Sequence, residues 1–336
     1  MWPWKSPARA DPEDSDAPAY TNLSYITILT AVLPIVAWLY VKRRRRQRAR
    51  RRSGLRPKAV VITGASSGLG FALAYRLASQ NDHVVAVDND ENGLRRLARL
   101  LPEHSLTTVV CDVTDPKSVR RAAQATVEAV GSIDAILNFA GVIKGGPLVE
   151  MDDADLALVM SVNVVGTCLI NKHFFPLIKP GPAAKIVNVA SEVSKARIST
   201  AFNAPYTMSK LAVEAYSDSL RQELSLLCNP IAVTVVQAGA FKTPLTEFKT
   251  PLNFGSFGKG RWAAALRKAG AVSELYIRRH SREPALLADA VAHLVHSTQP
   301  PRHLVVNMSL TMRAASLSPQ PVLDFFVRRQ FGEAGG

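Results

Sequence analysis

Seven short apolar runs rich in β-branched residues constrain the fold of this chain more than any other feature. They lie between residues 59 and 308 and read AVVIT, HVVAVD, LTTVVCD, AILNFAG, KIVNVAS, VTVVQAG and HLVVNM. None alternates cleanly between apolar and polar residues, which is typical of parallel strands buried on both faces. Longer amphipathic segments separate the runs. This alternation predicts an α/β fold with a doubly wound parallel sheet of seven strands.

The amphipathic segments predict helices that cover both faces of this sheet. We place these helices at residues 69–80, 91–101, 116–130, 152–177, 206–227 and 284–296. Although a length of 336 residues suggests two domains, the strands and helices together make one Rossmann-type domain at residues 58–310. Residues 311–336 then form a C-terminal tail. Its aromatic and basic end could lie on a membrane surface or pack over the domain.

An uncharged apolar segment at residues 23–41 precedes this domain. Nineteen helical residues span about 28 Å, close to the bilayer hydrocarbon core of about 30 Å. Two basic and four acidic residues precede the segment, whereas nine basic residues follow it between positions 42 and 52. This order is the reverse of a cleaved secretory signal, and the positive-inside rule places residues 1–22 in the lumen. We therefore expect a single transmembrane helix, a basic juxtamembrane linker at 42–57 and a cytosolic domain on the endoplasmic reticulum.

The net charge of +14 comes mainly from the linker. Eleven of the 41 basic residues lie between Lys42 and Lys58, which leaves 30 basic residues against 27 acidic ones elsewhere. A basic face for nucleic acid is therefore not expected. We interpret the basic run as a stop-transfer signal that also lies on anionic headgroups, in preference to a nuclear-localisation or nucleic-acid role.

Metal and disulfide sites are not expected. The three cysteines stand far apart and form no CxxC pair, which suits a reducing compartment. His293 and His296 share a helix face, but no third ligand lies near them in the sequence.

A glycine-rich turn, TGASSGLG, joins the first predicted strand to the first predicted helix at residues 63–70. Glycines at such positions allow a sharp turn and a close approach of the backbone to a pyrophosphate, which the helix N-terminus then meets. Asp88 ends the second strand, 18 residues after Gly70. That offset suits a carboxylate bound to the adenosine ribose hydroxyls. The turn therefore predicts a dinucleotide site.

Tyr206 and Lys210 lie four positions apart in a predicted helix. Side chains at i and i+4 share a face, so the phenol and the ammonium group point into the same space. A nearby cation stabilises the phenolate and lowers the tyrosine pKa from its usual value of about 10. Ser191 ends the preceding strand, at the carboxyl edge of the sheet where ligands bind in this architecture.

The motifs TGASSGLG, NFAG, SVN, NVAS and YTMSK occur in this order within residues 58–308 and resemble those of the short-chain dehydrogenase/reductases. The resemblance implies a catalytic group of Asn163, Ser191, Tyr206 and Lys210. The tyrosine would exchange a proton with the substrate oxygen, the serine would orient that oxygen, the lysine would hold the nicotinamide ribose, and the asparagine would position a water. Ser194 is an alternative for the serine role, because the gap from Ser191 to Tyr206 is slightly long.

The resemblance also implies that Asp112 and Val113 contact the adenine side of the cofactor and that Thr243 contacts the carboxamide. Asn138, Ala140 and Gly141 of the NFAG motif would line the cofactor. We expect NAD to be preferred over NADP, because Asp88 would repel a 2′-phosphate and Asn89 and Ser67 offer no cation. Cytosolic NAD is mostly oxidised, which favours alcohol oxidation. The predicted cofactor contacts are Gly64, Ser66, Ser67, Gly68, Leu69, Gly70, Asp88, Asp112, Val113, Asn138, Ala140, Gly141, Tyr206, Lys210 and Thr243.

The stretches EAYSDSLRQELS and AGAFKTPLTE resemble the membrane-bound retinol and hydroxysteroid dehydrogenase branch. This implies an alcohol–carbonyl oxidoreductase acting on a lipophilic steroid-like or retinoid-like molecule, in a homodimer or homotetramer. Alternatives are a 3-keto sphingoid or acyl lipid reductase and a non-catalytic protein that senses the cofactor. We expect residues 241–282 to cover the substrate. The aromatic residues in this region suit an apolar ligand or the ordinary packing of a lid; they are Phe248, Phe254, Phe257, Trp262 and Tyr276.

Overall fold

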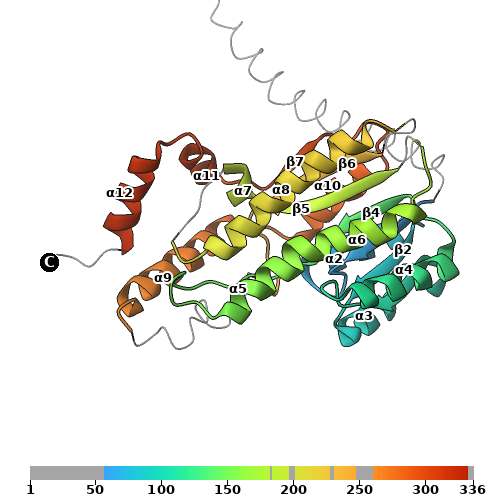
Figure 1. Ribbon diagram of the computed structural model, residues 1–336, viewed down its shortest axis with the longest axis horizontal. Coiled ribbons are helices and arrows are strands. Elements are labelled where there is room, and N and C mark those ends of the chain that lie inside the picture. Colours follow the sequence, from blue (N-terminus) through green and yellow to red (C-terminus); the bar gives the residue numbers. More distant parts are fainter. Residues whose placement is uncertain (1–56, 182–183, 197–200, 228–230, 247–259, 332–336) are drawn as a thin grey trace, which may run out of the picture. The chain divides into compact units, whose positions relative to one another are not determined.

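Seven parallel strands form one sheet in the order β3-β2-β1-β4-β5-β6-β7 (Figure 1). This computed structural model describes residues 57–181, 184–196, 201–227, 231–246 and 260–331. The strands are β1 (Ala59–Thr63), β2 (His83–Asp88), β3 (Leu106–Val110), β4 (Ala135–Asn138), β5 (Lys185–Ser191), β6 (Ala232–Ala238) and β7 (His303–Val306). Every neighbouring pair is parallel. The predicted Rossmann-type sheet is thus confirmed.

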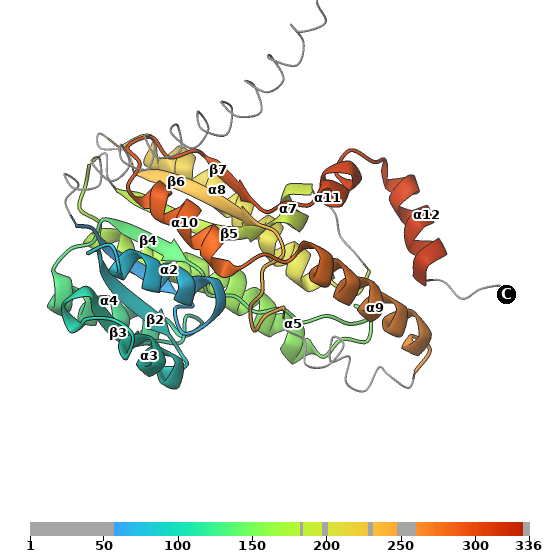
Figure 2. The same ribbon diagram turned by 180° about the vertical axis from the view of Figure 1, so that it is seen from behind.

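Helices cover both faces of the sheet (Figures 1 and 2). One face carries α2 (Gly68–Ala78), α3 (Glu91–Ala98) and α10 (Pro284–Val295). The other carries α4 (Pro116–Val130), α6 (Thr167–Phe174) and α8 (Ala204–Leu224). Each face has its own buried apolar cluster, to which alternate strand residues contribute, so that Val60 packs on one side and Val61 on the other. This two-sided burial explains why the strand sequences do not alternate with polar residues.

The helical run predicted at 152–177 is not a uniform α-helix. It consists of α5 (Asp153–Met160), the π-helical turn η2 (Ser161–Gly166), α6 and the 3₁₀ turn η3 (Phe175–Leu177). By length and hydropathy alone, Asp153–Leu177 is the one helical run in the described part of the chain that could cross a membrane. Here it packs against α4 and α8.

Five further helical elements were not predicted. They are α7 (Glu192–Ala196), α9 (Ala263–His280), α11 (Leu310–Ala315), α12 (Gln320–Phe331) and the 3₁₀ turn η1 (Glu103–Ser105). Helix α12, in the C-terminal tail, contacts α9. The predicted lumenal tail and transmembrane helix, and the linker except for Pro57, lie outside the described residues, as do Phe248, Phe254 and Phe257.

Buried carboxylates hold the amino-terminal edge of the sheet together. Asp82 accepts a hydrogen bond from the Lys58 backbone N–H at 2.9 Å, and Asp134 accepts one from Ala59 N–H at 3.0 Å. His296 Nε2 lies 2.7 Å from Asp82 Oδ2. These contacts fix the start of β1, and the opposite, carboxyl-terminal edge is left for the functional site.

Candidate active site

The glycine-rich turn after β1 is tightly packed. Gly64 and Gly68 have φ angles of 69° and 56°, a backbone region that side chains rarely adopt. A Cβ atom on Gly64 would lie 2.7 Å from Ala140 N, and one on Gly70 would lie 2.1 Å from Gly64 O. Ser67 precedes α2 without a side-chain cap, so the first N–H groups of this helix remain available to an anion.

A cavity of about 560 Å³ lies against this turn. It opens where β1 adjoins β4 in the sheet order, the position at which α/β sheets commonly bind ligands. Twelve of the predicted cofactor contacts line it: Gly64, Ser66, Ser67, Gly68, Leu69, Gly70, Asp88, Asp112, Val113, Ala140, Gly141 and Thr243. Its size and lining therefore fit an extended nucleotide.

Sequence reasoning missed several lining residues. They include Phe139, Val142, Leu158, Val162, Pro244 and Leu245, which give part of the cavity an apolar wall. Their proximity comes from tertiary packing of β4, α5 and the segment after β6, and no local pattern marks it. Thr243 lies close to the turn, because a Cβ atom on Gly68 would approach its side chain to 3.3 Å.

Asp88 stands at the end of β2, on the cavity wall. Its Oδ2 accepts a hydrogen bond from Ser66 N–H and its Oδ1 accepts one from Asp90 N–H, both at 3.0 Å. The carboxylate is thus fixed against the glycine-rich turn. Each oxygen keeps a lone pair that could accept a ribose hydroxyl.

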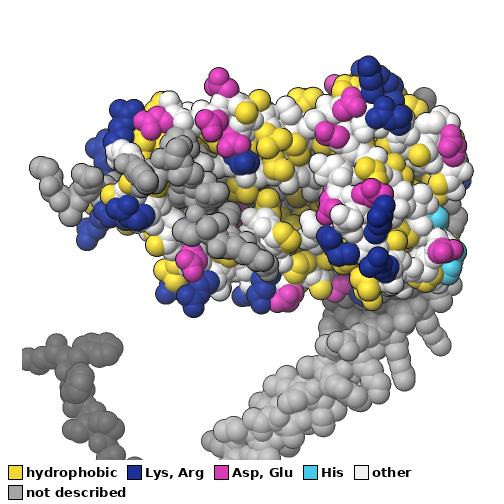
Figure 3. Space-filling view, turned by 90° about the horizontal axis from the view of Figure 1, so that it is seen from below, with side chains coloured by type: hydrophobic (Ala, Val, Ile, Leu, Met, Phe, Trp, Pro, Cys, Tyr) yellow, Lys and Arg dark blue, Asp and Glu magenta, His cyan; other side chains and the backbone are white. Residues whose placement is uncertain are grey.

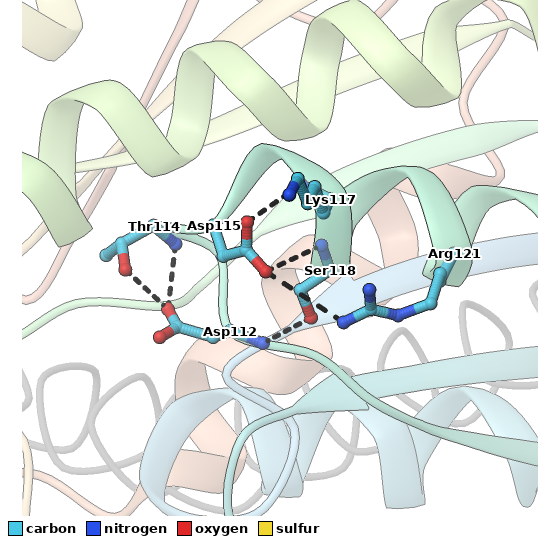
Figure 4. A network of polar contacts seen from close by, with 6 residues as sticks. All are labelled: Asp112, Thr114, Asp115, Lys117, Ser118 and Arg121. Carbon is cyan, nitrogen blue, oxygen red and sulfur yellow. Dashed lines mark hydrogen bonds and ion pairs between the residues drawn. The ribbon is translucent and has the colours of Figure 1, made fainter.

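Asp112 is held by the loop that starts α4 (Figure 4). Its N–H donates to Ser118 Oγ at 3.1 Å, and its Oδ1 accepts from Thr114 N–H at 2.8 Å and Thr114 Oγ1 at 2.7 Å. Asp115 caps α4 by accepting from the N–H groups of Lys117 and Ser118. The hydrogen bond from Lys117 is the main reason that the pKa of Asp115 is lowered. This cap positions Asp112 at the cavity.

Asn138, a further predicted cofactor contact, is buried at the end of β4 and does not line the cavity. Its amide donates to Asn171 Oδ1 and to Asn188 Oδ1, both at 2.8 Å. Thr63 Oγ1 accepts the next two backbone N–H groups, of Phe139 and Ala140, at 3.1 Å each. These bonds tie β1, β4 and β5 together beneath the cavity.

Asn163 lies in the π-helical turn η2 and is fully buried. Its Oδ1 accepts from Val142 N–H at 2.8 Å, and its Nδ2 donates to Val142 O at 3.0 Å and to Ser209 Oγ at 2.9 Å. A Cβ atom on Gly141 would lie 3.3 Å from Asn163 Oδ1 and 3.5 Å from Lys210 Nζ. Asn163 and Lys210 therefore both lie beside Gly141, which lines the cavity, whereas Asn163, Tyr206 and Lys210 are not themselves among its lining residues. π-helical turns occur often at functional sites.

Lys210 and Tyr206 lie on α8, with Lys210 Nζ 5.7 Å from the centre of the Tyr206 ring. Nζ donates to Val189 O at 3.0 Å. Burial lowers the pKa of Lys210 to about 8. Burial also raises the pKa of Tyr206, a hydrogen bond with Ser191 opposes this, and the charge of Glu192 raises it further. The pKa of Tyr206 is therefore raised, and not lowered as its spacing from Lys210 predicted, so that Tyr206 is a phenol at neutral pH in the protein without ligand.

Ser194 is engaged elsewhere. Its Oγ lies 2.7 Å from Ser191 O and 2.8 Å from Glu214 Oε1, and it is almost completely buried. Ser191, in contrast, is the serine that shares a hydrogen bond with Tyr206. The structure thus brings Ser191, Tyr206 and Lys210 together and turns Ser194 toward Glu214.

Comparisons with known proteins agree with this architecture. The short chain dehydrogenase family model matches residues 58–252. Retinol dehydrogenase 7 of Rattus norvegicus is 34% identical over 200 residues, which cover 59% of this chain and 61% of that protein. Retinol dehydrogenase 16 of the same species is 31% identical over 265 residues, covering 74% of this chain and 80% of the relative.

A solved structure shares the fold. It is a short chain dehydrogenase/reductase from Burkholderia phymatum, crystallised in complex with NAD. The two proteins are 24% identical, and the match covers 83% of this chain and 98% of that one with a TM-score of 0.66.

Proposed function

Because the chain belongs to the short-chain dehydrogenase family, we propose that it interconverts an alcohol and a carbonyl on a lipophilic, steroid-like or retinoid-like substrate. The observation that carries this proposal is the grouping of Ser191, Tyr206 and Lys210 at the carboxyl-terminal edge of the sheet. A protein that only bound the cofactor would have no use for this proton-transfer group.

Each of these side chains has a proposed role. The Tyr206 hydroxyl donates a proton to the substrate carbonyl oxygen, or takes one from the alcohol in the reverse direction. The Ser191 hydroxyl orients that oxygen. Lys210 holds the cofactor ribose and favours the phenolate electrostatically, and Asn163 positions a water for proton relay. A nicotinamide cofactor bound in the cavity supplies or accepts the hydride.

The cavity residues support a dinucleotide as this cofactor. The uncapped start of α2 and the close approach at Gly64 suit a pyrophosphate. Asp88 suits the adenosine ribose. Among the described residues that line the cavity, none is Lys, Arg or His. These features favour NAD over NADP.

A lipophilic substrate is supported by the surroundings of the site. Leu158, Val162 and Leu245 contribute apolar surface to the cavity. Figure 3 shows hydrophobic side chains bordering a hollow on one face of the molecule. Relatives that match the chain include retinol dehydrogenases. A 3-keto sphingoid or acyl lipid is the second candidate, since an apolar wall would accept its chain equally well.

Membrane anchoring is the other part of the proposal. The apolar segment at 23–41 and the basic residues after it support a single span with the domain in the cytosol, on the endoplasmic reticulum. Protease added to sealed microsomes should digest the domain and spare a short N-terminal piece. Survival of the domain until detergent is added would place it in the lumen.

Cofactor turnover against a panel of steroids, retinoids and keto lipids tests the catalytic proposal. Turnover with one class identifies the substrate, whereas cofactor binding without turnover on any of them favours the sensing alternative. Tyr206→Phe should abolish turnover while the cofactor still binds, because only the hydroxyl can move a proton. Turnover by Tyr206→Phe within about tenfold of that of the parent would show that Tyr206 is not the acid–base residue.

A further inference from the structure

Glu192 is a buried carboxylate directly after Ser191. It begins α7 and is 5% exposed. Its Oε1 accepts a hydrogen bond from Tyr276 Oη at 2.7 Å, and its Oε2 accepts one from Ser309 N–H at 3.3 Å. Burying a carboxylate is costly unless such donors satisfy it. Neither the proposed proton transfer nor the proposed cofactor contacts use this group.

The two partners of Glu192 come from segments far away in the sequence. Tyr276 lies on α9, which belongs to the region expected to cover the substrate, and Ser309 is the residue that caps α11. Tyr276 Oη is also 2.8 Å from Ser309 Oγ, which in turn lies 2.9 Å from Thr311 Oγ1. One carboxylate thus joins the end of β5, the covering helix and the start of the C-terminal helices.

Glu192 also acts on Tyr206 electrostatically. Its negative charge raises the pKa of Tyr206, in addition to the larger effect of burial. Burial raises the pKa of Glu192 itself. Its hydrogen bonds to Tyr276 and Ser309 and the charge of His280 on α9 oppose this shift without cancelling it. The ring of His280 packs against Tyr276 at 4.7 Å. From α8, Lys210 lies beside Tyr206, and Glu214 faces Ser194 of α7.

From this geometry we infer that Glu192 is a positioning residue that latches α9 and α11 to the strand end carrying Ser191 and keeps a negative charge beside Tyr206. This inference rests on the proposed function, because it concerns the acid–base residue of that reaction. It means that the docking of the substrate-covering helix and the protonation of Tyr206 depend on the same carboxylate.

Three variants separate the charge from the contact. Glu192→Gln removes the charge and keeps an acceptor for Tyr276. Tyr276→Phe removes the hydroxyl and leaves the charge. Glu274→Gln, the control, removes an exposed carboxylate from the same helix. The measurements are the pH profile of kcat/KM for alcohol oxidation and hydrogen exchange of peptides covering 263–280 and 310–315.

Glu192→Gln should move the alkaline rise of oxidation to lower pH by about one unit, because removing a neighbouring negative charge makes the phenolate easier to form. Tyr276→Phe should leave the alkaline rise of the pH profile where it is. It should speed hydrogen exchange in α9 and raise KM by a larger factor than it lowers kcat. Glu274→Gln should change neither measurement. If the alkaline rise of kcat/KM in Glu192→Gln stays at the pH of the parent, the inference is overturned, since a purely structural role does not move a pH profile.

Hydrogen exchange separates failure of this inference from failure of the proposed function. If the parent turns over no substrate, the proposed reaction is wrong, yet exchange still reports on the latch. Glu192→Ala and Tyr276→Phe should then both speed exchange at 263–280 at least tenfold over Glu274→Gln, as expected when a buried anchoring contact is lost. Exchange equal to that of the parent would overturn the latch.

Discussion

The side-chain amide of Asn163 donates a 2.9 Å hydrogen bond to Oγ of Ser209. This bond joins the π-helical turn η2 to α8, the helix that carries Tyr206 and Lys210. Ser209 Oγ in turn donates to Tyr206 O at 2.7 Å. The orientation of Asn163 therefore depends on a residue of the catalytic helix that sequence reasoning did not single out.

Ser209→Ala tests this connection. Asn163 would keep both contacts with Val142 and lose its link to α8. We expect kcat to fall about tenfold and the free energy of unfolding to fall by about 1–2 kcal/mol, as for a buried hydrogen bond with one partner removed. Steady-state kinetics and urea unfolding measure the two effects.

Ser217→Ala is the matched control for that experiment. Ser217 is equally buried on α8, accepts from Asn188 Nδ2 at 2.9 Å and donates to Val213 O. Ser217→Ala should lower the free energy of unfolding by a similar amount and leave kcat unchanged. Equal losses of kcat in the two variants would show that the Asn163–Ser209 bond has no special link to catalysis.

Much of the fold could be predicted from the sequence, because buried parallel strands leave a strong local pattern. The bounds of β1, β2 and β5 coincide with their apolar runs. The π-helical turn could not be predicted, because a segment of six residues is too short for its period to be read from the hydrophobic pattern. Helix α9 was not predicted either; it contains Gly270, a residue that disfavours helix interiors.

The candidate site divides in the same way. Tyr206 and Lys210 are brought together by helical spacing alone, and the glycine-rich turn is defined within eight residues, so both were visible in the sequence. The contact of Glu192 with Tyr276 joins residues 84 positions apart. It depends on how α9 packs, which no local pattern records. The choice between Ser191 and Ser194 likewise depends on the course of α7.

Ser191→Ala and Ser194→Ala should affect kcat and stability in opposite ways. Ser191→Ala removes the hydroxyl that bonds Tyr206 and should lower kcat about 10²–10³-fold, as loss of one oxygen-stabilising donor does. Ser194→Ala should leave kcat within a few fold and reduce stability, because its Oγ bonds Glu214 and Ser191 O. The reverse ranking of kcat values would transfer the catalytic role to Ser194.

The stability of the protein should depend on pH because of the buried Lys185. Burial, aided by the charge of Lys58, lowers its pKa from 10.5 to about 8, although Asp134 opposes the shift. Below pH 8 both folded and unfolded states are protonated, and the cost of burying the charge is fully present. Between pH 8 and 10.5 the folded state releases its proton first, so the unfolded state binds more protons and stability rises with pH.

Lys185→Met removes the amino group whose titration makes stability depend on pH. The stability of the parent relative to the variant should therefore increase from about pH 8 to about pH 10.5, as measured by urea unfolding at several pH values. Lys179→Met, at an exposed position near the start of the same strand, is the control. A parent-to-variant difference that stays constant with pH for Lys185→Met would show that Lys185 does not titrate as described.

Cofactor choice follows from the charges around Asp88. This carboxylate is fixed by Ser66 N–H and Asp90 N–H. Asp90 and Asp112 also line the cavity. A 2′-phosphate would meet like charge there. Arg96 pairs with one of these acids: its Nη2 lies 3.4 Å from Asp90 Oδ2, and its side chain is 59% exposed.

We therefore expect kcat/KM to be higher with NAD than with NADP. Asp88→Ala combined with Asn89→Arg should move the preference toward NADP, because it removes one repulsion and adds a charged donor for the phosphate. Arg96→Ala in the parent is the control and should leave the NAD preference unchanged. If the parent uses NADP as well as NAD and loses this ability with Arg96→Ala, then Arg96 turns from Asp90 to the phosphate, and the carboxylate at position 88 does not decide cofactor choice.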